Sequence, residues 1–218
     1  MMMLGLVGAH RTGKTTLAEA YAKKSGATLV KMEIGTLQKE LGYDSSNQSY
    51  DFDTRMTIQE HLLRRFDEIY SSIKGLDAVC DRTPLDLIGY AMLAVTDDLS
   101  DAQSARLTQY VTDCVNLTNE RFTSLVLLQP GVPLTSSDTS AKSVLALMEK
   151  LNLIYLGTFS DERLIVPHFY IPRAMLDINL RIKACELGIK KSLERKRANK
   201  TREVRTLGGV EFSTSVRQ

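Results

Sequence analysis

One short segment has the residue types and spacing that a phosphate-binding loop requires. It matches the pattern GxxxxGK[ST] in full and reads Gly8-Ala9-His10-Arg11-Thr12-Gly13-Lys14-Thr15. Glycines allow backbone N–H groups to converge on phosphate oxygens, and a helix that begins at the end of the loop adds partial positive charge. We expect Lys14 to reach the β- and γ-phosphates of a nucleotide and Thr15 to place its hydroxyl on Mg²⁺.

The flanking residues fit the same interpretation. Residues 2–7 are a short apolar run, which predicts a buried strand, and residues 15–24 have helical spacing with Leu17 and Tyr21 on one face. Thr16 completes the predicted nucleotide-binding set, although a plain helix position explains it as well. Because motif, strand and helix agree, a chance glycine-rich turn is a poor explanation of the loop.

A second candidate is the dipeptide Asp81-Arg82, which follows a strand predicted at residues 77–80. Thr83 is a good N-cap and Asp86 stands where a capping box needs an acid, so a helix is expected over residues 84–95. Ligands of parallel α/β folds bind at the carboxyl ends of strands, which favours a functional role for the dipeptide. A structural ion pair is the alternative.

Further strands are expected at residues 28–32, 123–129 and 168–171. Helices are expected over residues 53–73, from Ser100 onward, over residues 140–155, and along an apolar stripe formed by Ile178, Ile182, Cys185 and Ile189. This alternation of strand and helix predicts a parallel sheet covered on both faces. The base-reading motif NKxD of GTPases is not met by Asn199-Lys200-Thr201-Arg202, and a motor ATPase needs a longer chain, so a small kinase remains.

The loop GAHRTGKTT, the strand end DAVCDRTPLDL and the length of 218 residues resemble the thymidylate-kinase-like group of P-loop kinases, especially phage-encoded members. The resemblance rests on these two motifs and extends to about Leu193. It implies an α/β three-layer sandwich, in which helices cover both faces of a five-stranded parallel sheet, with ATP and Mg²⁺ bound. His10 departs from the acidic residue that some relatives have before the loop arginine.

The resemblance also implies roles for individual residues. Arg11 is similar to an arginine in the loop of some thymidylate kinases, which would neutralise charge on the transferred phosphoryl group. Asp81 would approach Mg²⁺ or orient the acceptor, and Arg82 would grip an acceptor-side phosphate. Glu33 stands where related nucleoside kinases place a general base, which a hydroxyl acceptor needs and a phosphate acceptor does not.

Weaker candidates belong to the acceptor and lid sides. The expected kinase domain covers residues 1–198, with a lid at about 131–165, and a basic tail covers residues 199–218 as a hairpin or a disordered segment. Asp51, Arg55 and Asp53 are candidates for contacts in the acceptor pocket. Asp53 is equally well explained as an N-cap. Arg163 is the chosen phosphate contact of the lid, and Arg173 is a candidate for the border of the adenine pocket.

Composition and charge limit the remaining possibilities. The chain is 43% hydrophobic and 25% charged, and it has no apolar run long enough to span a bilayer. Its three cysteines are widely spaced. Together these features favour a reducing cytoplasm, which would be the cytoplasm of the host if the protein is encoded by a phage. Residues 188–205 contain eight basic and two acidic residues, a net charge of +6, whereas the whole chain carries +2. A segment with this charge can bind a polyanion, or it can simply be a helix face exposed to solvent.

The sequence leaves the acceptor open. One hypothesis is a free deoxynucleoside monophosphate, and another is the hydroxymethyl group of 5-hydroxymethyluracil in phage DNA, which the basic segment slightly favours because basic side chains supply much of non-specific DNA affinity. A third is a nucleotide-switched binding module that phosphorylates no acceptor. The oligomeric state stays open as well, with a dimer compatible with the resemblance.

Overall fold

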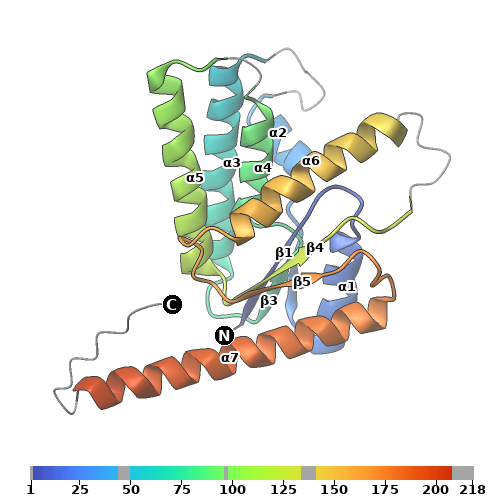
Figure 1. Cartoon of the computed structure of the whole chain (residues 1–218), viewed down its shortest axis with the longest axis vertical. Coiled ribbons are helices and arrows are strands. Elements are labelled where there is room, and N and C mark those ends of the chain that lie inside the picture. The colour runs from blue at the N-terminus through green and yellow to red at the C-terminus, as the bar shows by residue number, and fades with distance from the viewer. Residues whose placement is uncertain (1, 44–49, 96–97, 134–140, 208–218) are drawn as a thin grey trace.

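The structure is a computed structural model, which describes residues 2–43, 50–95, 98–133 and 141–207. Five strands alternate with seven helices along the described chain (Figure 1). In chain order the elements are β1 (Met3–Val7), α1 (Lys14–Ser25), β2 (Thr28–Val30), α2 (Ile34–Glu40), α3 (Phe52–Ser72), β3 (Ala78–Cys80), α4 (Pro84–Leu93), α5 (Asp101–Arg121), β4 (Ser124–Leu128), α6 (Ala141–Phe159), β5 (His168–Ile171) and α7 (Ile178–Leu207).

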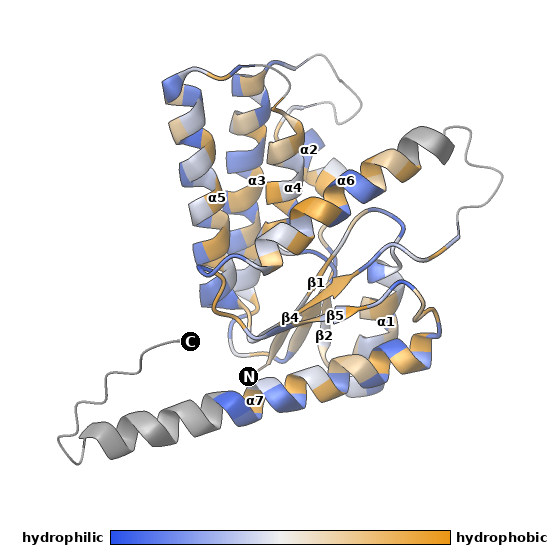
Figure 2. Cartoon of the chain, in the orientation of Figure 1, coloured by the Kyte–Doolittle hydropathy of each residue, from blue (hydrophilic) through white to orange (hydrophobic). Residues whose placement is uncertain are grey.

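The five strands form one parallel sheet in the order β2-β3-β1-β4-β5. Every residue of β1, β3 and β4 is buried, which explains why these segments are continuous apolar runs instead of alternating ones. One apolar cluster joins the sheet to α1 and α7, and a second joins the opposite face to α3, α4, α5 and α6. The predicted three-layer sandwich is therefore confirmed (Figures 1 and 2).

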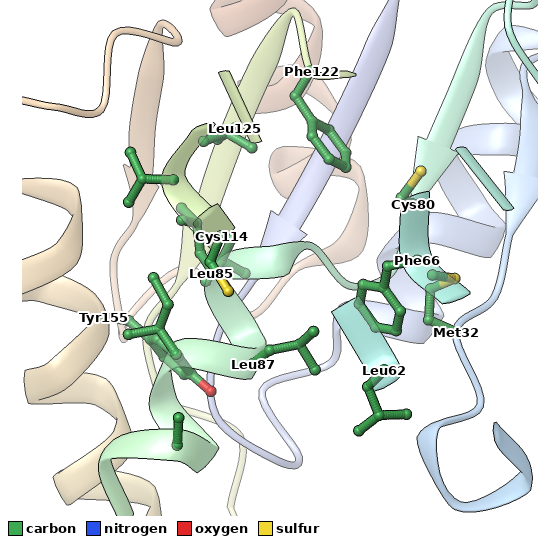
Figure 3. Close-up of a cluster of buried hydrophobic side chains, with 14 of the residues drawn as sticks. Met32, Leu62, Phe66, Cys80, Leu85, Leu87, Cys114, Phe122, Leu125 and Tyr155 are labelled. Atoms are coloured by element: carbon green, nitrogen blue, oxygen red, sulfur yellow. The ribbon is translucent and has the colours of Figure 1, made fainter. Parts of the chain in front are cut away.

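The larger cluster positions the helices that follow β2 and β3. Figure 3 shows Leu62 and Phe66 of α3 near Met32, with Leu87 of α4 beside them. All four side chains are almost completely buried, so α3, α4 and the segment after β2 contribute to the same apolar cluster. This packing holds α3 and α4 against the region where β2 ends, which is where polar groups gather.

Helix caps agree with the sequence in two places and differ in one. Thr83 and Asp86 form the expected capping box of α4, and Ser100 caps α5. The N-cap of α3 is Asp51, which accepts a hydrogen bond from the backbone N–H of Thr54, so the assignment of this cap to Asp53 was wrong. Asp53 lies in the first turn instead, where an acidic side chain interacts favourably with the helix dipole.

Two segments differ from expectation. Helix α2 was not predicted, because its seven residues are too few to show a clear period. Residues 199–207, placed in the tail from sequence, continue α7 as helix, so a hairpin does not start at Val204; the rest of the predicted hairpin lies outside the described residues. The predicted lid region is occupied largely by α6, which buries Met148, Leu151 and Tyr155 in the core.

Two other sequence expectations concern cysteines and membrane segments. Cys80, Cys114 and Cys185 are all buried and unpaired. Among the described helices none combines the length and the apolar character needed to cross a membrane.

Gly188 fixes how closely α7 approaches the sheet. A Cβ added there would lie 2.0 Å from a ring carbon of Phe169 on β5. We expect Gly188→Ala to lower the free energy of unfolding by about 1–3 kcal/mol, because helix and ring must separate. Gly157→Ala on α6 is the matched control: no heavy atom lies within 4 Å of its added Cβ. It should raise stability by about 0.5–1 kcal/mol through helix propensity. Urea denaturation measures both, and equal effects would contradict this account.

Candidate functional site

The loop between β1 and α1 has a backbone that its sequence makes possible. Gly8 and Gly13 have φ angles of 154° and 86°, and Arg11 adopts the left-handed region at 59°. A Cβ on Gly8 would lie 2.6 Å from the carbonyl oxygen of Leu128, so only glycine lets the loop pass the end of β4. Helix α1 begins directly after Gly13, and its N-terminus faces the loop.

Lys14 is folded into this loop. Its side chain is 6% exposed, and its Nζ donates hydrogen bonds to the carbonyl oxygens of Gly8 and Ala9. Burial lowers the pKa of Lys14 to about 8, and Asp86, 4.0 Å away, opposes that change. A cation held by neutral carbonyl groups in a buried loop is a strong attractor for a phosphate group, which would offer it charged oxygens.

Asp81 joins three segments at the carboxyl edge of the sheet. Its Oδ2 accepts a hydrogen bond of 3.0 Å from the hydroxyl of Thr15, and its Oδ1 accepts one of 2.9 Å from the backbone N–H of Met32. A hydroxyl and a carboxylate side by side fit the oxygen preference of Mg²⁺. The described residues hold no cluster of three or more acids, histidines or cysteines, so a Mg²⁺ ion here would take its other ligands from phosphates and water.

Asp86 is a buried carboxylate between two cations. It is completely buried, and its Oδ2 accepts the hydrogen bonds of the α4 capping box from Thr83. Its Oδ1 lies 4.0 Å from Lys14 and 4.0 Å from Arg82, too far for a hydrogen bond, and finds no other partner in the described chain. Burial raises the pKa of Asp86, and the two neighbouring cations oppose this.

A cavity of about 860 Å³ opens beside the Thr15–Asp81 pair. Its wall is built from the phosphate loop, the segment from β2 into α2, and helices α3 and α4, with one residue of α6. Its polar lining includes His10, Lys31, Glu33, Gln38, Arg55, Gln59, Arg82 and Tyr90. The cavity therefore places cationic, amide and carboxylate groups within one space next to the loop.

The predicted site residues separate into those that meet at this cavity and those that do not. His10, Thr15, Glu33, Asp81 and Arg82 all line it. Glu33 is exposed at the start of α2, where its Oε2 accepts a hydrogen bond of 3.2 Å from the hydroxyl of Thr36. The structure thus brings Glu33, the candidate base, to the same cavity as the candidate metal ligands.

Other candidates lie elsewhere. Arg163 pairs with Asp161 and donates to Thr112 of α5, so its selection as a phosphate contact was wrong. Arg163 shortly precedes β5, and every strand of a parallel sheet starts at the edge opposite the phosphate loop. Arg163 therefore lies at that opposite edge, away from the loop. Arg173 pairs with Glu149 of α6. Asp53 pairs with Arg106 of α5 at 3.2 Å. Arg55, by contrast, does line the cavity and donates to the carbonyl oxygen of Tyr50.

Arg181 of α7 was missed by the sequence interpretation. It is 3% exposed, and its Nη1 donates a hydrogen bond of 2.9 Å to the carbonyl oxygen of Thr12 inside the loop. Its Nε donates to the carbonyl oxygen of Met175, and Nη2 has no partner among the described residues. The interior of an amphipathic helix gave no signal for this contact, which joins residues 169 positions apart.

No family model and no curated protein sequence matches the chain. Solved structures do. Deoxyadenosine kinase from M. mycoides with bound dCTP is 16% identical, with a TM-score of 0.55, over 87% of this chain and all of that one. Thymidylate kinase from Ehrlichia chaffeensis is 12% identical, with a TM-score of 0.54, over 84% and 96%. The YorR protein from Bacillus subtilis, in complex with phosphorylated GDP, is 13% identical, with a TM-score of 0.53, over 87% and 96%. The chain therefore has the α/β fold of P-loop kinases.

The contact between Arg181 and Thr12 predicts that α7 stabilises the nucleotide-binding shape of the loop. Arg181→Met should weaken ADP·Mg²⁺ binding by about 5–10-fold, because one hydrogen bond from a charged donor to the loop backbone is lost. Arg195→Met, an exposed change on the same helix, is the matched control and should leave binding unchanged. Isothermal titration calorimetry measures both. Equal affinities for the two variants would rule out this role.

Proposed function

We propose that this protein transfers the γ-phosphoryl group of ATP to a hydroxyl group of a nucleoside-type acceptor. The observation that carries the proposal is the cavity itself: it opens beside the Thr15–Asp81 pair and has the carboxylate of Glu33 in its wall. A candidate metal site and a candidate base thus line one cavity, which lies next to the candidate phosphate loop.

On the donor side, the loop would hold the phosphates with its backbone N–H groups and Lys14. Thr15 and Asp81 would hold Mg²⁺, which supplies neutralisation of the phosphate charge. Arg11, at the loop tip, is expected to add positive charge beside the transferred group. Arg181 stabilises the loop by a hydrogen bond to the carbonyl oxygen of Thr12.

On the acceptor side, Glu33 would accept the hydroxyl proton as the oxygen attacks the γ-phosphorus. The new O–P bond forms as the bond to the β-phosphate oxygen breaks, and ADP leaves with the electron pair. Arg82 and Arg55 provide positive charge in the cavity, and Gln59 provides an amide suited to the edge of a base. Deoxyadenosine kinase and thymidylate kinase share the fold of this chain, which supports a nucleoside-type acceptor.

The position of the basic segment bears on DNA as the acceptor. Helix α7 starts near the loop, where Arg181 contacts Thr12, and by Ser192 it has reached Ser124, the first residue of β4. Lys190 and Lys191 therefore lie toward the amino edge of the sheet, away from the cavity, and α7 continues beyond that edge (Figure 1). This geometry favours a free nucleoside or nucleotide over DNA as the acceptor. The hydroxymethyl group of 5-hydroxymethyluracil in DNA is the second candidate, motivated by the +6 charge of residues 188–205.

One assay separates the possible acceptors. Purified protein is incubated with γ-labelled ATP, Mg²⁺ and, in turn, thymidine, thymidine monophosphate, or an oligonucleotide containing 5-hydroxymethyluracil. We expect label on a free acceptor and no transfer by Lys14→Ala, which should keep the fold. Label on the oligonucleotide alone would establish the second candidate. Hydrolysis of ATP without any labelled acceptor would instead indicate a nucleotide-switched module and overturn the proposal.

Replacing Glu33 tests whether the acceptor group is a hydroxyl. Glu33→Gln should lower kcat by about 10²–10⁴-fold, because a general base is lost, while the KM for ATP stays unchanged. Glu40→Gln, at the other end of α2, is the matched control and should be active. Steady-state kinetics measure both variants. Full activity of Glu33→Gln with thymidine monophosphate would mean that a phosphate oxygen is the nucleophile.

The basic segment has its own test. Substituting Lys190, Lys191, Arg195, Lys196 and Arg197 by alanine should weaken DNA binding and flatten its dependence on salt, because each lost phosphate contact removes close to one unit of slope. Transfer to a free acceptor should not change. Fluorescence anisotropy across a salt series measures the slope. An unchanged slope would mean that this segment is a solvated helix face.

A further inference from the structure

Two polar side chains of α4 approach the phosphate loop. The hydroxyl of Tyr90 is hydrogen-bonded to Nε2 of His10. One turn earlier, Oδ1 of Asp86 lies 4.0 Å from Nζ of Lys14. The same oxygen lies 4.0 Å from Arg82, which lines the cavity. A single oxygen of α4 therefore faces one cation of the loop and one cation of the cavity.

The two oxygens of Asp86 have different surroundings. Oδ2 accepts hydrogen bonds from the backbone N–H and the hydroxyl of Thr83, and these belong to the capping box of α4. Oδ1 has no hydrogen-bond partner among the described residues, although the side chain is completely buried. The cap therefore accounts for one oxygen of Asp86 and leaves the other, which faces the two cations, unexplained.

A capping box does not need a negative charge. In the capping box of α5 the corresponding residue is Gln103, whose neutral amide oxygen accepts a hydrogen bond from the backbone N–H of Ser100. Asp86 instead carries a carboxyl group, and burial alone would favour its neutral form. The two neighbouring cations oppose burial and favour the charged form. The choice of an acid at this buried position is thus explained by the cations and not by the cap.

We propose that Asp86 is a positioning residue whose negative charge holds Lys14 of the phosphate loop and Arg82 of the cavity wall beside the same oxygen. The two cations then keep a fixed relation to each other, one on the donor side and one on the acceptor side of the transferred phosphoryl group. The role of Arg82 rests on the proposed function, because it requires an acceptor in the cavity. The contact with Lys14 concerns nucleotide binding alone.

Asp86→Asn separates the charge from the cap. The amide oxygen can still accept from Thr83, whereas an NH₂ group takes the place of Oδ1 and faces the two cations. We expect kcat to fall by about 10²-fold with whichever of thymidine, thymidine monophosphate or the oligonucleotide is phosphorylated, because Lys14 and Arg82 are displaced. The affinity for ADP·Mg²⁺ should stay the same or increase, since less negative charge near the loop favours phosphate binding. Steady-state kinetics and isothermal titration calorimetry measure the two quantities.

Thr83→Val is the matched control, because it removes the hydroxyl of the same cap and keeps the charge of Asp86. It should lower Tm by about 2–4 °C, the effect of one lost N-cap, and leave kcat close to that of the wild type. If Asp86 served only the cap, the two variants would lose activity equally. That result, or weaker binding of ADP·Mg²⁺ by Asp86→Asn, would overturn the positioning role.

A double variant keeps the test decisive if Asp86→Asn alone does not fold. Arg82→Met combined with Asp86→Asn removes one cation together with the buried anion, so the sum of charges at this point is that of the wild type. Its acceptor KM should equal that of Arg82→Met alone, because Asp86 acts on the acceptor side through Arg82. A further rise in the acceptor KM of the double variant would contradict this.

The failure of the proposed function has a separate signature. If none of the three probes receives label, the proposed function fails, and the acceptor-side role of Asp86 fails with it. Titration with ADP·Mg²⁺ needs no acceptor, so it decides the contact with Lys14 by itself: affinity retained or increased in Asp86→Asn supports the contact, and weakened affinity refutes it.

Discussion

The carboxylate of Asp81 is the contact on which the site depends. Through its two oxygens it holds the hydroxyl of Thr15 on α1 and the backbone N–H of Met32 beyond β2, while it extends β3 itself. Three segments from different parts of the chain therefore meet at the Asp81 side chain. Because the carboxyl ends of parallel strands share one edge, this single side chain sets how the phosphate loop and the cavity face each other.

Positive charge around this point is balanced by few acids. Lys14 and Arg82 approach the completely buried carboxylate of Asp86, and neither reaches hydrogen-bonding distance of its Oδ1. Unpaired buried charge is costly, so the arrangement is suited to a ligand that brings negative charge of its own. Burial, and after it the positive charges of the same cations, lowers the pKa of His10 to about 4.

Local patterns predicted much of the fold. The apolar runs of β1 and β4, and the caps of α4 and α5, are properties of a few consecutive residues, and the structure has them. Arg163 shows where local reasoning failed. It was assigned to a lid from its place between two strands, but a segment that leads into a parallel strand must approach the edge opposite the loop. The topology of the sheet imposes that position, and residue type does not.

What the sequence by itself determined is the loop between β1 and α1: within eight neighbouring residues, Gly8, Gly13, Lys14 and Thr15 match what the backbone geometry and chemistry of a phosphate-binding loop require. Only the tertiary structure decided what surrounds it. Arg181 reaches Thr12 across 169 positions, and Tyr90 reaches His10 across 80. Both partners lie on helices whose own periodicity is explained by burial, so their polar contacts leave no mark in the sequence. Packing against a shared sheet brings them to the loop.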